Sequence, residues 1–174
     1  MRGQSLVEFA LASVVLVLLF GGLVDLTRAI HYADVLQNAV REGARQGASF
    51  DPATASNPYF DNTDIKRLVD AQLNAGGLPS SVLKSPGCVA GLDGNAWSNP
   101  PYANSAFPLV ANQPWLYICY DKTSSVPPGT FTYPERDLNV ILLMAYGPLT
   151  AAVPTPLGGN FGLTANWHIR VQGG

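Results

Sequence analysis

Charged residues are scarce in this chain. Lysine, arginine, aspartate and glutamate together supply 13% of its 174 residues, and the formal net charge is -2. Proteins that bind nucleic acid carry a clustered excess of positive charge. The composition therefore argues against a nucleic-acid surface, and we expect no nucleic acid among the partners.

Residues that carry out catalysis or hold metals are also few. The two histidines are His31 and His168, and no Cys-His nucleophile pair, phosphate loop or dinucleotide glycine pattern accompanies them. His31, Asp34 and Glu42 could be drawn as a metal set, but a solvated helix face explains them better. We therefore expect no enzyme, no catalytic residue, no metal site and no cofactor.

Proline is absent before Pro52, although the whole chain contains 14 prolines. Apolar residues in this first part recur every three or four positions, which is the spacing of a helix. We predict one continuous helix over residues 4–49, about 68 Å long. A globular head over residues 50–174 follows, with long loops rich in proline, glycine and asparagine.

The first half of the predicted helix is a long apolar run. Leu6 to Val24 is about 28 Å long as a helix, which just spans a bilayer. Glu8 is its only charge, and a carboxylate near hydrocarbon costs roughly 2–4 kcal/mol, so we expect Glu8 to have a function and a partner. A cleaved secretory signal competes with this interpretation, but only Arg2 supplies a basic start and no Ala-x-Ala cleavage site follows the run.

Two neighbouring glycines, Gly21 and Gly22, lie inside the apolar run. Each glycine in a helix costs up to about 1 kcal/mol relative to alanine. The pair is either a tolerated small-residue contact in lipid or a flexible segment that can stretch or unwind when its surroundings change.

The second half of the helix is rich in small residues, including Ala29, Ala33, Gly43 and Gly47. Small residues permit close approach between helices, so this stripe predicts helix packing against neighbouring subunits. The alternative is that the stripe only covers the sheet of its own chain. We expect both, on different sides of the helix.

The head is predicted to be a small sheet with one short helix. Residues 64–75 form the helix, capped by Thr63 or Asn62. Strand candidates are residues 116–120, 163–171 and 139–146, the last being either a buried central strand or a helix turn. Residues 88–90 are a further candidate, paired with 116–120. The fold class is therefore α+β: a long N-terminal helix, a short second helix and an antiparallel sheet of three to five strands.

Two cysteines and several aromatic residues lie in the loops and strands of the head. Cys88 and Cys119 favour a disulfide, with two buried free thiols as the alternative. Trp97, Tyr102 and Trp115 lie in or beside a long loop. They are candidates for surface contacts with a partner or ligand, and the alternative is that they fold back as lids on the sheet.

The start of the chain resembles a known family. The segments Gly3-Gln4-Ser5-Leu6-Val7-Glu8-Phe9-Ala10, 24–29 and 37–45 resemble the TadE-like pseudopilins, within the wider type IV pilin class. More weakly, residues 139–149 and 163–171 look like the family's closing strands. The resemblance implies that residues 1–3 are a short leader cut after Gly3 by a prepilin peptidase. It also implies that Glu8 neutralises the new amine of Gln4 on a neighbouring subunit during assembly.

The resemblance implies a structural function. The chain would wait in the inner membrane with its head outside, and then assemble through its helix into an extracellular type IV filament used for adhesion. Its partners would be copies of itself, other pilins, the peptidase and the assembly machinery. The alternatives are a membrane-tethered extracytoplasmic binding module and a minor pseudopilin that does not form the bulk filament.

Overall fold

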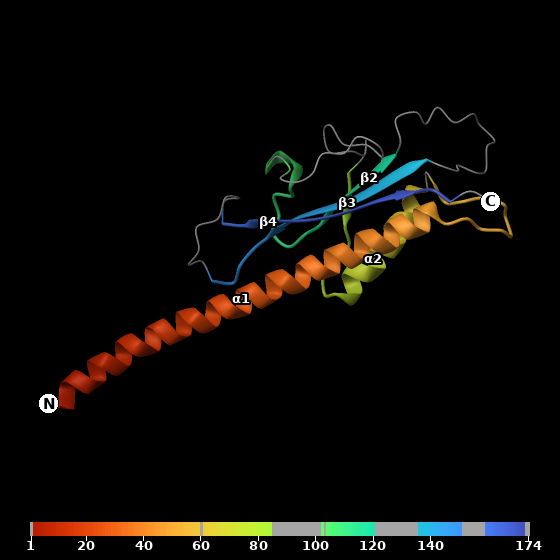
Figure 1. Cartoon of the computed structure of the whole chain (residues 1–174). Coiled ribbons are helices and arrows are strands. Elements are labelled where there is room, and N and C mark those ends of the chain that lie inside the picture. The colour runs from red at the N-terminus through yellow and green to blue at the C-terminus, as the bar shows by residue number, and fades with distance from the viewer. Residues whose placement is uncertain are drawn as a thin grey trace.

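The computed structural model describes residues 2–59, 61–84, 102, 104–120, 136–150 and 159–172. Its dominant element is one helix of 47 residues, α1 (Arg2–Ala48). The C-terminal half of α1 lies along the head, whereas the N-terminal half extends well beyond it (Figure 1). The long helix and the α+β class predicted from the sequence are both confirmed.

The second helix, α2 (Asn62–Ala75), packs beside the end of α1. Its N-cap is Asp61, whose carboxylate accepts hydrogen bonds from the amides of Thr63 and Asp64, both at 3.0 Å. The predicted cap at Thr63 or Asn62 is therefore wrong by one or two positions. Aspartate is as good an N-cap residue as asparagine or threonine, and Asp61 is the one whose carboxylate reaches the free amides of the first turn. The helix ends at Ala75 with Gly76 as its C-cap, and Gly77 follows with a positive φ of 79°.

The sheet has four strands in the order β1-β2-β3-β4 within the described residues. They are β1 (Val82–Leu83), β2 (Trp115–Tyr120), β3 (Asp137–Tyr146) and β4 (Phe161–Arg170), and a short 3-10 turn, η1 (Asn104–Ala106), precedes β2. β2, β3 and β4 are antiparallel, but β1 pairs with β2 in parallel. The predicted all-antiparallel sheet is therefore wrong at this edge, because two residues are too few to show a strand pattern. Residues 88–90 lie outside the described residues.

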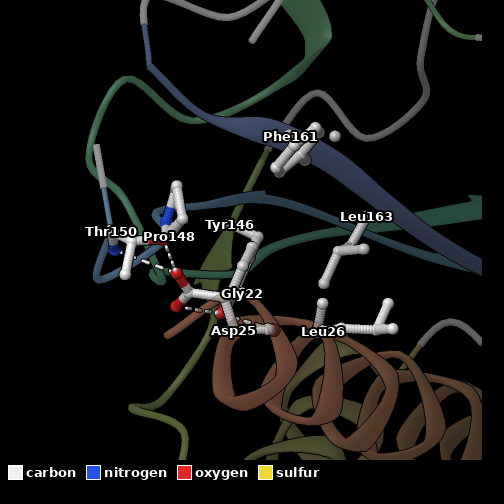
Figure 2. A pocket seen from close by; sticks show the side chains of 10 residues that line it. Gly22, Asp25, Leu26, Tyr146, Pro148, Thr150, Phe161 and Leu163 are labelled. Atoms are coloured by element: carbon white, nitrogen blue, oxygen red, sulfur yellow. Dashed lines mark hydrogen bonds between the residues drawn. The ribbon is translucent and has the colours of Figure 1, made fainter. Parts of the chain in front are cut away.

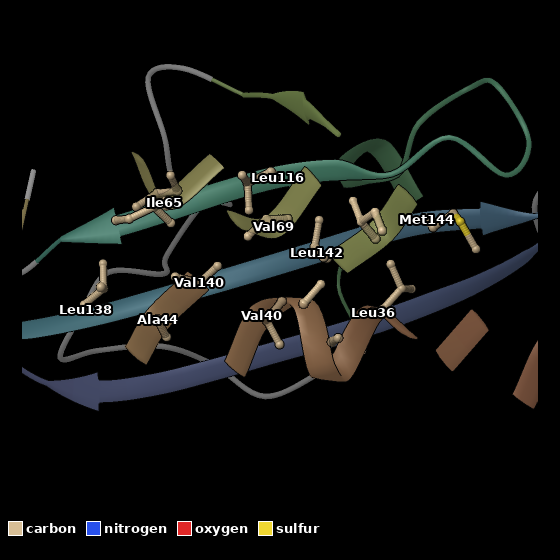
Figure 3. Close-up of a cluster of buried hydrophobic side chains, with 14 of the residues drawn as sticks. Leu36, Val40, Ala44, Ile65, Val69, Leu116, Leu138, Val140, Leu142 and Met144 are labelled. Carbon is tan, nitrogen blue, oxygen red and sulfur yellow. The ribbon is translucent and has the colours of Figure 1, made fainter. Parts of the chain in front are cut away.

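The main core lies between the sheet and the two helices. Every residue of β3 is buried, and its Leu138, Val140 and Leu142 point toward the helices. Leu36, Val40 and Ala44 of α1 meet them, together with Ile65 and Val69 of α2 (Figure 3). The choice left open for residues 139–146 is thus settled as a central strand. A smaller cluster covers the opposite face of the sheet; its members are Tyr102, Phe107, Tyr117, Cys119, Ile141 and Leu143.

Candidate functional site

The described part of the head leaves the large apolar side chains in the first half of α1 exposed. The large apolar side chains between Leu6 and Val24 are 49% to 74% exposed. By length and composition this part of the helix is able to cross a membrane. An apolar surface of this size is not stable in water, so it needs lipid or other protein around it. We call residues 6–24 the uncovered half of α1 and residues 25–48 the packed half.

The predicted processing and assembly residues lie at the start of the uncovered half. The backbone of Gly3 and Gln4 is already helical. The side-chain amide of Gln4 donates to the Glu8 carboxylate at 3.3 Å, one helical turn further on. Glu8 is exposed on the helix surface, where a neighbouring chain can reach it. Cleavage after Gly3 and a charge pair at Glu8 stay predictions.

The two halves of α1 meet at a buried carboxylate, Asp25, that the sequence pattern does not single out. Asp25 is only 8% exposed. It accepts hydrogen bonds from the Leu149 amide at 2.7 Å, the Thr150 amide at 2.9 Å and the Thr150 hydroxyl at 2.5 Å. The Tyr146 hydroxyl donates to the Asp25 backbone carbonyl at 3.0 Å, as Figure 2 shows from close by. We call Asp25, Tyr146, Leu149 and Thr150 the Asp25 junction.

The electrostatics of the Asp25 junction fit an ionised carboxylate with neutral donors. Burial, and next the charge of Asp25, raise the pKa of the Tyr146 phenol above its ordinary value, so the phenol keeps its proton. Arg28 lies one turn away, with a guanidinium nitrogen 4.0 Å from the Asp25 carboxylate and its carbon 5.9 Å from the Tyr146 ring centre. Hydrogen bonds to a charged group are worth about twice the neutral kind, so the junction is a strong attachment.

The two mid-helix glycines differ in their surroundings. A Cβ atom on Gly21 would lie 2.8 Å from the Thr150 Cγ2 atom, whereas one on Gly22 would meet nothing within 4 Å. Gly21 is therefore needed for the close approach of the 147–150 loop. The predicted flexibility of the pair stays a prediction. Gly21 and Asp25 are four residues apart on one helix face, and this spacing is the sequence signal that could have indicated the contact.

An apolar pocket of about 440 Å³ opens beside the junction. It lies between α1 and the ends of β3 and β4, as Figure 2 shows. Its polar end comes from Asp25, Tyr146 and Thr150 of the junction. Its apolar walls come from Leu26, Ala29, Pro148, Phe161 and Leu163.

The small residues of the packed half divide into two groups. A Cβ atom on Gly43 would lie 2.6 Å from Val69, and one on Gly47 would lie 2.7 Å from Ile65. Gly43 thus serves the close approach of α2 of the same chain. Gly47 faces both α2 and the sheet, because its Cβ atom would also lie 2.6 Å from Leu138 of β3. Ala29 and Ala33 are only partly buried. Packing of these two alanines against another subunit stays a prediction.

The aromatic candidates in the head are not a cluster of free surface residues. Tyr102 is 8% exposed and its hydroxyl accepts a hydrogen bond from Asn166 at 3.1 Å, so the surface role is wrong for it and the lid alternative holds. Trp115 is half-buried, with the Lys84 ammonium 3.4 Å from its ring centre. Trp97 lies outside the described residues.

Among the described cysteine and histidine candidates, Cys119 lies in the core and His31 contacts a neighbouring helix. Cys119 is fully buried in β2, and Cys88 lies outside the described residues, so their disulfide stays a prediction. The His31 ring nitrogen lies 3.2 Å from the Gly76 carbonyl oxygen, so this side chain contacts the end of α2. In the part of the chain that the structure describes, no group of three or more metal-ligand residues comes together.

Comparison with known proteins supports the family resemblance at the N-terminus. Residues 3–45 match the family model of TadE-like protein, which confirms the resemblance drawn from the sequence over this segment. The match covers the uncovered half, Asp25 and most of the packed half, and ends before the head. No curated protein and no solved structure matches the chain.

Proposed function

We propose that this chain, whose residues 3–45 match the TadE-like model, is a structural pilin-like subunit of a Tad-type pilus. The observation that carries the proposal is the uncovered half of α1, an apolar helix that is continuous with a second half built into the head. Such a helix fits two environments in turn. It can anchor the chain in the inner membrane, and it can later form the core of an extracellular filament used for adhesion.

Glu8 is the residue on which the assembly step depends. Hydrolysis of the Gly3–Gln4 peptide bond by a prepilin peptidase would give Gln4 a free, positively charged amine. A carboxylate and an amine are each costly beside hydrocarbon, but paired between two subunits they satisfy each other. Because Glu8 lies one helical turn from Gln4 and is exposed, a neighbour displaced along the helix axis can form this pair.

The proposal is tested by Glu8→Ala in cells that make the filament. We expect the variant to stay in the membrane fraction and to be lost from sheared filaments by at least tenfold, which corresponds to about 1.4 kcal/mol of assembly energy. Asp34→Ala is the matched control, because Asp34 is an exposed acid on the same helix outside the apolar run. Mass spectrometry of wild-type filaments should find a first peptide that begins at Gln4.

The same experiment separates the alternatives. Normal filaments from Glu8→Ala would contradict the assembly mechanism. A chain that is absent from wild-type filaments but present in membranes would be the tethered binding module. A trace amount in the filament fraction would identify a minor pseudopilin.

A further inference from the structure

The base of the head lies level with the last turns of the apolar run. Thr150 contacts the helix at Gly21, which belongs to the uncovered half, and Leu149 and Thr150 both donate to Asp25. Wherever the run from Leu6 to Val24 spans a bilayer, these contacts therefore bring the 147–150 loop to the bilayer surface.

The apolar surface of α1 does not end at Val24. Asp25 is covered by the loop, and the next outward side chains, Leu26 and Ile30, are 58% and 55% exposed. From Phe9 to Ile30 the helix is about 33 Å long, slightly more than the roughly 30 Å of a hydrocarbon core. Arg28 is compatible with this depth, because its side chain lies against Tyr32 and can extend toward the headgroups.

The apolar pocket opens at the same level. Leu26 and Ala29 form its helix wall, and Pro148, Phe161 and Leu163 form its head wall. Leu149, in the loop beside the pocket, is 69% exposed. Water binds poorly in an apolar pocket, because an ordered water molecule needs polar partners for its hydrogen bonds.

We propose that the base of the head is seated in the outer-leaflet interface of the membrane and that a phospholipid acyl chain fills this pocket. The Asp25 junction would hold the loop in place and shield the carboxylate from the lipid. Lipid is the favoured occupant over a second copy of the chain, because the pocket is continuous with the membrane-spanning surface and reaches the bilayer before any assembly. The inference rests on the membrane insertion in the proposed function but not on filament formation.

Depth measurements on the full chain in phosphatidylglycerol–phosphatidylcholine vesicles test the seating. A spin label on Leu149→Cys is compared with labels on Val15→Cys, inside the run, and Ala71→Cys, an exposed site on α2. Labelled wild type corrects for the two native cysteines. We expect the Leu149 label to favour oxygen over a water-soluble nickel complex several-fold more than the Ala71 label does. Equal ratios at Leu149 and Ala71 would overturn the seating.

Gly22→Leu tests the pocket. Gly22 lines the pocket and a Cβ atom there would meet nothing within 4 Å, so the new leucine can occupy the pocket without a clash. The substitution also removes a glycine from a helix. Native mass spectrometry should detect phospholipid retained on the wild-type chain and a several-fold loss on Gly22→Leu, with Val15→Leu as the control. Unchanged retention would overturn the acyl-chain site.

Two further results of the depth measurements would show which assumption of the proposal is wrong. Protection of Leu149 that appears only at high protein-to-lipid ratio would assign the surface to a second copy of the chain and overturn the lipid proposal. A Val15 label outside the bilayer would show that α1 does not insert, which contradicts the anchoring step of the proposed function as well.

Discussion

The two halves of α1 share one unbroken helix but obtain their stability from different sources. Leu36, Val40 and Ala44 of the packed half are fully buried against the chain's own sheet. Between Leu6 and Val24, by contrast, large apolar side chains are 49% to 74% exposed. Helix length and propensity do not reveal this difference, because both halves are equally helical. The packed half specifies the head, and the uncovered half is left for lipid or other subunits.

The largest expected effect comes from matched truncations in the two halves. Leu36→Ala should lower the free energy of unfolding of the head by about 2–5 kcal/mol, because it leaves a cavity in a close-packed core. Leu16→Ala should change it by less than about 0.5 kcal/mol. Urea unfolding of the full chain in detergent micelles, followed by tryptophan fluorescence, measures both. Similar losses from the two variants would show that the uncovered half contributes to folding of the head.

An intermediate effect is expected at the Asp25 junction, where the halves meet. Asp25→Ala removes the acceptor of several hydrogen bonds and should cost about 2–4 kcal/mol, whereas Thr150→Val removes one donor and should cost about 1 kcal/mol. Hydrogen exchange at the Leu149 and Thr150 amides should accelerate most in Asp25→Ala. Asp34→Ala is the control for loss of an exposed charge, and equal exchange in both alanine variants would contradict the junction.

The smallest effect concerns the neighbouring glycines, where we expect alanine substitutions to change the stability of the head in opposite directions. Gly21→Ala should destabilise the head by about 1 kcal/mol, because its Cβ would displace a Thr150 side chain that is hydrogen-bonded to Asp25. Gly22→Ala should leave stability unchanged or raise it by up to about 1 kcal/mol through helix propensity. Thermal melts of the two variants give the comparison, and a loss from Gly22→Ala as large as that from Gly21→Ala would refute it.

Periodic patterns made most of the fold predictable. Helical spacing and the missing proline indicated α1, and the continuous apolar run of residues 139–146 indicated either a buried central strand or a helix turn, of which the structure shows the strand β3. β1 escaped prediction because it has two residues, and its parallel pairing depends on contacts far apart in the sequence. The residue pattern of a single strand or helix does not show which other segment it pairs with.

The candidate site was predictable only in part, for a related reason. Glu8 stands out because it is a charge inside an apolar run. Asp25 does not stand out, because an aspartate just after such a run usually faces water. Its burial depends on Thr150, which lies 125 positions away, so a local pattern could not predict it. Likewise, the partners of Gly43 and Gly47 proved to belong to the same chain: α2 for both glycines, and also β3 for Gly47.

The spacing of the two attachments between α1 and the head has a mechanical consequence. The head is fixed to the helix at Asp25 and again along the core contacts that reach Ala48, about 35 Å further along the axis. A body joined to a rod at one point can swivel, but a body joined at two distant points keeps both its position and its angle. A sideways force on the head would therefore become a bending moment on the bare helix below residue 21.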